Sequence, residues 1–219
     1  ESIITRECLL ELISTFLLSF FLIFSSQPSS NLHLSFSILD GLITFILTTL
    51  FTNNDGICVH LNPAISFSIC IRSLQGLLTL ISRCIGQFIG SLLGFLLSYS
   101  LESSNLFNDS LQSTPSSPNP LYANRTQMFF IETIFTCLIC LPYLSPSPKP
   151  SVIAATRVQF NQLKFIGYSS NFFLQLNSCI ISLISSPSSS TGLPFLFLSL
   201  FSTIIGSLLS IIFSYLLPL

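Results

Sequence analysis

The sequence predicts an all-α membrane protein with six transmembrane helices plus two re-entrant half-helices, arranged as two inverted repeats. Three observations predict this fold class. The chain carries few charged residues, several of its apolar runs have the length of a bilayer span, and segments of its first half recur in its second half.

The composition excludes a typical water-soluble domain. Only 7 Lys and Arg and 8 Asp and Glu occur among 219 residues, and 50% of the residues are hydrophobic. A soluble domain of this size would have about a quarter of its residues charged. The net charge of −1 indicates no nucleic-acid partner. We find no nucleotide motif, metal-ligand set or nucleophile–base pair, so we expect no enzymatic activity, no metal and no cofactor.

Apolar runs of about 17–25 residues predict membrane-spanning helices, because the hydrocarbon core of a bilayer is about 30 Å thick. Five such runs cover residues 8–25, 35–51, 76–101, 128–144 and 193–217, and a weaker sixth covers 152–168 with five polar or charged side chains. Two shorter runs, 62–72 and 177–185, are too short to cross and predict half-helices that enter and return. The first run also resembles a cleaved signal peptide, but the Glu11 inside it argues against that interpretation.

The segment 102–127 predicts an extracellular connecting loop. It is rich in Ser, Pro and Asn and holds two glycosylation acceptors, at Asn108 and Asn124. Arg6, Arg72 and Lys149 then lie on the other face, which the positive-inside rule makes cytoplasmic. We therefore expect a multi-pass membrane glycoprotein with a cytoplasmic N-terminus, in the plasma membrane rather than an intracellular one.

Two separate segments of the first half recur in the second. Residues 11–17, Glu-Leu-Ile-Ser-Thr-Phe-Leu, align with 132–138, Glu-Thr-Ile-Phe-Thr-Cys-Leu, and the sequence Ile-Gly-Ser-Leu-Leu occurs at both 89–93 and 205–209. Each half holds three spans, so the second copy enters the membrane inverted, and inverted repeats place a site between the halves at the midplane. The predicted division is a first repeat at 1–101, the loop at 102–127 and a second repeat at 128–219.

The repeat relates Asn62-Pro63-Ala64 to a second motif. Asn62 lies 27 residues before the first Ile-Gly-Ser and Asn177 lies 28 before the second, so Asn177-Ser178-Cys179 is the predicted counterpart. Asn is a strong N-cap and Pro is favoured at the first helical position, so Asn62 should begin a half-helix. Two opposed half-helices would present positive dipole ends at mid-membrane, which disfavours cations and leaves the two asparagine amides to bind neutral solutes.

Residues 58–66, Cys-Val-His-Leu-Asn-Pro-Ala-Ile-Ser, resemble the first pore loop of the aquaporin, or major intrinsic protein, family. A Glu at the start of the first and fourth spans and a glycine-rich third span are similar to family features as well. The resemblance implies a passive channel for water and/or small neutral solutes such as glycerol, with four monomers in the bilayer. Two alternatives stay open: a secondary transporter of the inverted-repeat type, and a non-conducting relative with a structural role.

The resemblance also implies roles for three polar residues. Glu11 and Glu132 would hold the pore loops by accepting backbone hydrogen bonds, with a proton relay as the alternative, and His60 would be a fixed polar support. Arg83 and Asp40 are intramembrane charges to which the sequence assigns no partners.

The second motif departs from the family's N-P-A-R, because it lacks both the proline and the arginine of the selectivity filter. The predicted filter positions are Leu42, or Asp40 if Gly41 is the anchor, together with Phe165 and Ile180. Such a filter is less polar than a strict water filter and makes glycerol as plausible a solute as water. Cys179 is predicted to face the pore, so that thiol reagents would block flux.

Overall fold

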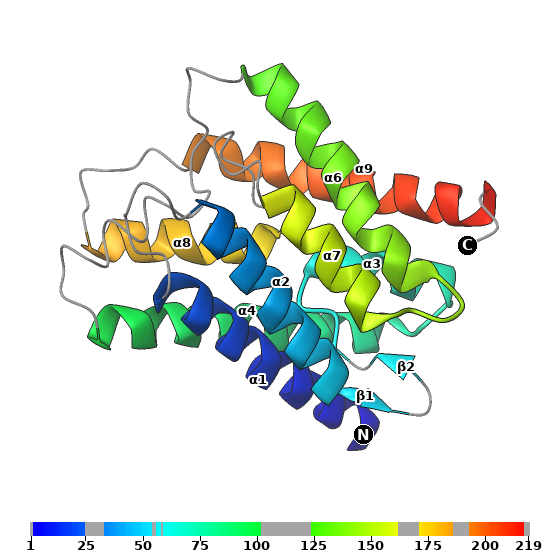
Figure 1. Cartoon of the computed structure of the whole chain (residues 1–219), viewed down its shortest axis with the longest axis horizontal. Helices are drawn as coiled ribbons and strands as arrows, with labels where there is room; N and C mark the ends of the chain where they lie inside the picture. Colours follow the sequence, from blue (N-terminus) through cyan, green and yellow to red (C-terminus); the bar gives the residue numbers. More distant parts are fainter. Residues whose placement is uncertain are drawn as a thin grey trace.

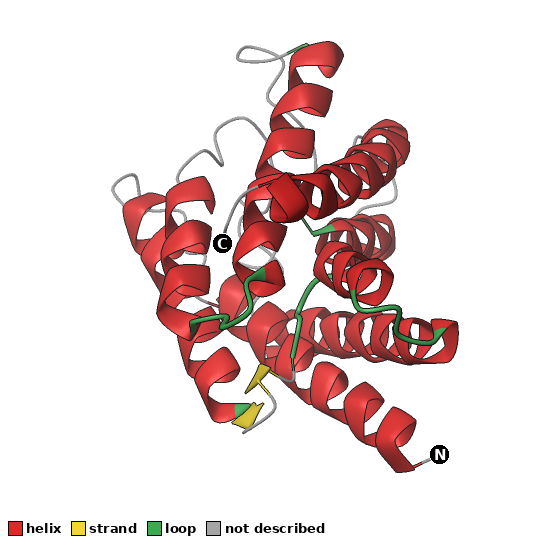
Figure 2. Cartoon of the chain, turned by 90° about the vertical axis from the view of Figure 1, so that its right-hand side faces the viewer, coloured by secondary structure: helices red, strands yellow, loops and turns green. Residues whose placement is uncertain are grey.

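The structure, a computed structural model, describes residues 2–24, 33–53, 56–57, 59–101, 124–161, 171–185 and 193–216. Within these ranges the chain forms helices joined by short loops and turns, together with one antiparallel pair of two-residue strands, β1 (Thr52–Asn53) and β2 (Gly56–Ile57), at the edge of the bundle in Figure 2. The helices are α1 (Ser2–Phe24), α2 (His33–Leu50), α3 (Pro63–Arg72), α4 (Leu77–Leu101), α6 (Arg125–Leu144), α7 (Pro150–Asn161), α8 (Phe172–Ser185) and α9 (Leu193–Leu216). The predicted all-α fold class is confirmed.

The helices pair in the way that two related halves require. Helix α1 packs along α4, α6 packs along α9, and α2 packs along α7 (Figure 1). The half-helices cross between these pairs, since α3 packs on α9 and α8 packs on α4. Each short helix is therefore held by the last long helix of the other half, which interlocks the two halves.

Close contacts at two glycines show the same register in both halves. A Cβ at Gly90 would collide with the carbonyl oxygen of Leu12 on α1, and a Cβ at Gly206 would lie 2.6 Å from the carbonyl oxygen of Thr133 on α6. Leu12 and Thr133 each directly follow a buried glutamate. The two glycines belong to the recurring Ile-Gly-Ser segments, so these segments make equivalent helix contacts.

The bundle buries many hydroxyl side chains and exposes many apolar ones, as a protein in an apolar solvent should. Fully buried side chains include Ser14, Ser19 and Ser207, whereas Leu93 and Phe201 are exposed. The hydroxyls of these three serines donate to carbonyl oxygens of their own helix, for example Ser14 to Leu10 at 2.6 Å. This back-bonding satisfies Ser and Thr inside helices, so a serine-rich interior costs little.

Three helical segments of the described chain are long and apolar enough to cross a membrane: Leu77–Leu101, Arg125–Leu144 and Leu196–Leu216. The weak sixth run at 152–168 begins as α7, which starts at Pro150, and its end from 162 onward lies outside the described residues. The predicted half-helix at 177–185 is longer than expected, because α8 starts at Phe172.

The described part of the predicted loop 102–127 belongs to the start of α6. Asn124 caps this helix, its side chain accepting a hydrogen bond from the Gln127 backbone at 2.8 Å while the Gln127 side chain accepts one from the Asn124 backbone. This reciprocal capping box explains why α6 begins at Arg125. Asn108, the other glycosylation candidate, lies outside the described residues.

Candidate pore site

The first half-helix begins where Asn62-Pro63-Ala64 predicts. Asn62 has extended backbone angles, φ −157° and ψ 128°, and its Oδ1 accepts a hydrogen bond from the Ala64 backbone at 3.0 Å. Pro63 occupies the first turn, where its missing N–H group costs nothing. Asn62 and Ala64 are about 1% exposed, so this helix N-terminus lies deep inside the bundle.

The Glu11 carboxylate holds the loop that leads to Asn62. Its two oxygens accept backbone hydrogen bonds from His60 at 2.6 Å and from Leu61 at 3.0 Å, and the side chain is fully buried. Leu61 has a φ of 63°, a left-handed conformation that costs a non-glycine residue about 1–3 kcal/mol. Its N–H donates to Glu11 and its carbonyl accepts from Asn171, so both polar groups of the strained residue are fixed.

Arg83, unassigned from the sequence, joins this support. Its Nη2 lies 3.0 Å from a Glu7 oxygen, and its Nη1 lies 3.3 Å from Glu11 and 3.0 Å from Nε2 of His60. An arginine only donates, so His60 Nε2 is the acceptor and Nδ1 carries the proton that is shared with Ser66 Oγ at 3.0 Å. This arrangement suits the fixed polar support that the resemblance implies for His60.

The second half-helix begins at Asn171, and the prediction that Asn177 begins it is wrong. Asn171 Oδ1 accepts hydrogen bonds from the Phe173 and Leu174 backbones at 3.2 and 3.4 Å, whereas Asn177 lies inside α8. Helix α8 has 14 residues where α3 has 10, and the segment that follows it is also longer, at 186–192 against 73–76. The second cap therefore lies 34 residues before the repeated Ile-Gly-Ser where the first lies 27 before it, and the predicted Asn177 is six residues too late. A usable signal existed, because Asn171 directly precedes an apolar run and Asn177 interrupts one.

Asn177 instead docks α8 against α4. Its Nδ2 donates to the Phe88 carbonyl at 3.1 Å and to Ser91 Oγ at 2.5 Å. Ser68 on α3 has the equivalent place, also six residues after its cap, and its Oγ lies 3.2 Å from Ser210 Oγ on α9. Ser178 and Cys179 follow inside the helix with 1% and 4% exposure, so neither lies at the helix N-terminus as predicted.

The two caps meet through one hydrogen bond. Asn171 Nδ2 donates to the carbonyl oxygen of Leu61, the residue before Asn62, at 2.8 Å. In Figure 1, α3 and α8 lie toward opposite ends of the bundle, so their N-termini point toward the centre from opposite directions. The arrangement of two opposed half-helices is present, with Asn171 in the place proposed for Asn177.

The predicted filter residues are not brought together. Leu42 is 51% exposed on the outer face of α2, Phe165 lies outside the described residues, and Ile180 lies well inside α8. The residue three positions after the second cap is Leu174. The filter position therefore holds no arginine when it is counted from Asn171, just as it holds none when it is counted from Asn177.

Gly41, the alternative anchor on α2, packs against α7. A Cβ there would collide with the Val158 side chain and would lie 3.1 Å from the Ala154 carbonyl. This contact places the neighbouring Asp40 at the interface of the two helices, where it is 2% exposed and lies 3.7 Å from Nη1 of Arg157.

Glu132 occupies the place in α6 that Glu11 has in α1. One of its oxygens accepts a hydrogen bond from Ser199 Oγ on α9 at 2.7 Å. By the glycine register, Ser199 corresponds to Arg83, since each lies seven residues before its glycine. Residues 162–170, which precede the second cap, lie outside the described residues, so the predicted loop contact of Glu132 cannot be located.

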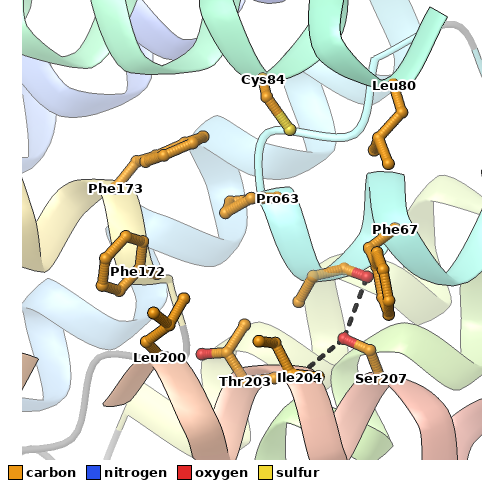
Figure 3. Close-up of a pocket in the computed structure, with 11 residues that line it drawn as sticks. Pro63, Phe67, Leu80, Cys84, Phe172, Phe173, Leu200, Thr203, Ile204 and Ser207 are labelled. Carbon is orange, nitrogen blue, oxygen red and sulfur yellow. Dashed lines mark hydrogen bonds between the residues drawn. The ribbon is translucent and has the colours of Figure 1, made fainter. Parts of the chain in front are cut away.

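An apolar cavity of about 200 Å³ lies beside the caps (Figure 3). Its wall includes Pro63 from α3, Phe172 and Phe173 from α8, Cys84 from α4 and Ile204 from α9. The figure shows Pro63 and Phe172 directed into the same space from opposite half-helices. Its exposed surface is apolar, and Thr203 and Ser207 are the polar residues of its wall.

Comparison with known proteins identifies the family and a solved structure of similar fold. A profile described as Major intrinsic protein matches residues 1–159. The X-ray structure of the aquaglyceroporin from Plasmodium falciparum has a similar fold, with a TM-score of 0.74 at 18% sequence identity, covering 97% of this chain and 94% of that chain. Comparison with curated proteins gives no match. The profile covers well over half of the sequence, so this integral membrane chain belongs to the major intrinsic protein family, whose members are channels and not enzymes.

Proposed function

We propose that this chain is a passive channel for water and small neutral solutes, with its narrow region between the caps of α3 and α8. The observation that carries the proposal is the Asn171–Leu61 hydrogen bond of 2.8 Å, which joins the N-termini of two opposed half-helices inside the bundle. Such a junction presents unsatisfied N–H groups and positive dipole ends to the middle of the membrane.

The dipoles account for the exclusion of ions. Each helix N-terminus carries about half a positive charge. At about 5 Å and an effective dielectric constant of about 20, each end repels a monovalent cation by about 1.7 kcal/mol, and two ends by about 3 kcal/mol. That energy disfavours cations by about two orders of magnitude, before dehydration is counted, while a neutral solute pays none of it.

The solute proposed is glycerol as well as water. Leu174 stands where the family's filter arginine would be, which gives the second half-helix an apolar side chain at that position. A polyol needs an apolar wall for its carbon chain and donors for its hydroxyls. The structural neighbour described above is an aquaglyceroporin, which supports the same choice.

Assembly and placement are further parts of the proposal. We expect a homotetramer with one pore in each monomer, in the plasma membrane, with a cytoplasmic N-terminus and glycosylation at Asn108 in the long loop. Exposed apolar faces on α4 and α9 support contact with lipid or with another subunit, for example at Leu93 and Ile212.

The test is stopped-flow swelling of proteoliposomes that contain the purified chain, with water, glycerol, urea and hydrogen peroxide in turn. A passive channel gives flux that stays linear in the gradient and does not depend on an ion gradient. Saturation and ion coupling would indicate a secondary transporter. Flux equal to that of bare lipid for every solute would indicate a non-conducting relative and would refute the proposal.

A further inference from the structure

The ion pair between α2 and α7 contains an incompletely bonded arginine. Arg157 is 6% exposed, and its Nη1 lies 3.7 Å from Asp40. Its Nε and Nη2 have no hydrogen-bond partner among the described residues. A guanidinium buried in a membrane protein is costly unless its donors are satisfied, and the hydroxyl oxygens of a bound solute would satisfy these two donors.

The position of Arg157 on α7 directs it toward the caps. One turn earlier on the same face, Ile153 belongs to a buried cluster that also contains Ala64 and Ile65 of α3 and Tyr143 of α6. Ala64 and Ile65 of this cluster lie in the first turn of α3, directly after the Asn62 cap. Arg157, one turn after Ile153 on the same helix face, therefore lies close to the end of α3 that Asn62 caps.

The hydroxyl of Tyr143 is a second polar group without a described hydrogen-bond partner near Arg157. Its hydroxyl is buried without a hydrogen-bond partner among the described residues. It lies within electrostatic range of Arg157, Asp40 and Glu11, the residue that holds the pore loop. The Tyr143 ring also meets the His60 ring edge-on at 6.3 Å between centroids. Open donors from α7 and α6 thus converge beside the loop that ends at Asn62.

We propose that Arg157, held by Asp40 and flanked by Tyr143, is a hydrogen-bonding site that selects solutes in this channel. This inference rests on the proposed function. The Nε and Nη2 donors form a planar fork, which matches two oxygens of a polyol better than a single cation does. Helix α7 would then supply the guanidinium that α8, with Leu174, lacks.

The selectivity test compares Arg157→Lys with the wild type in proteoliposomes. Lysine keeps the charge and the pairing with Asp40 but loses the fork. We expect glycerol permeability to fall at least tenfold while water permeability changes less than threefold. Arg72→Lys, at the far end of α3, is the matched control and should leave the ratio unchanged. The double variant Asp40→Asn/Arg157→Gln, which removes both charges of this pair, should change the same ratio. A folded Arg157→Lys protein with an unchanged ratio would show that the pair only joins two helices.

A second measurement does not depend on flux. Tyr143→Cys should react with a small water-soluble thiol reagent, with the site located by mass spectrometry, whereas Leu138→Cys on the lipid-facing side of α6 should not. Reaction at Tyr143→Cys without flux for any solute would refute the proposed function, but it would support a solvent-accessible binding site at Arg157. If Tyr143→Cys does not react, the proposed binding site at Arg157 is refuted, whatever flux is measured.

Discussion

Replacing the two asparagines of α8 separately tests which of them belongs to the pore. Asn171→Ala removes an N-cap, which costs about 0.5–2 kcal/mol. It also leaves the buried Leu61 carbonyl without its partner at 2.8 Å, for about 1–3 kcal/mol more. The free energy of unfolding should therefore fall by about 1.5–5 kcal/mol. Because Leu61 precedes Asn62, we expect water permeability to fall at least tenfold.

Asn177→Ser is the matched variant on the same helix. Serine is the residue at the equivalent place on α3, and the Asn177 Oδ1 that it removes has no hydrogen-bond partner among the described residues. The Phe88 carbonyl that loses its contact lies within α4, so the stability change should stay below about 1 kcal/mol. Stopped-flow swelling measures the flux, and thermal unfolding in detergent measures the stability. Loss of flux in Asn177→Ser with normal flux in Asn171→Ala would refute the reasoning.

Three further predictions follow from the described contacts. Gly90→Ala should destabilise the protein by about 1–3 kcal/mol, because a methyl group there collides with α1, whereas Gly76→Ala, with open space around it, should change the Tm little. Glu11→Gln should abolish most water flux in swelling assays, because a neutral amide cannot accept from both loop N–H groups and also pair with an arginine. Glu132→Gln, whose described partner is a serine, should lose less water flux. Equal losses of flux in the two variants would contradict this difference. Thr203→Val should be neutral or raise the free energy of unfolding by up to about 1 kcal/mol in thermal unfolding, because the Oγ1 that it removes is buried without a partner among the described residues; a fall of more than 1 kcal/mol would mean that this hydroxyl is bonded.

The long helices and the first half-helix are predictable from local sequence. Apolar runs determine span lengths, and Asn62-Pro63 combines an N-cap with a first-turn proline, so each signal lies within a few residues of the structure that it specifies. The cap of α8 is harder to locate, because its position relative to the repeated Ile-Gly-Ser depends on the lengths of a helix and a loop. Neither length is encoded in the recurring residues themselves.

The ion pairs of the site depend on contacts between residues far apart in the chain. Arg83 meets Glu11 across 72 residues, and Asp40 meets Arg157 across an even longer separation. Hydropathy identifies each of these charges as unusual but says nothing about which one lies opposite. Their pairing follows from helix packing, which Gly41 determines for α2 and α7 by allowing close approach.

The bond from Asn171 to Leu61 also bears on how the protein reaches its final form. It joins residues separated by 110 positions, one in each half of the chain. During synthesis the first half enters the bilayer before Asn171 exists, so Leu61 must wait with its carbonyl unsatisfied or in another conformation. The left-handed turn at Leu61 can therefore become permanent only when the second half docks. The hydrogen bond that joins the two caps can therefore form only after most of the chain has been made, and it ties the conformation of the first half to the arrival of the second.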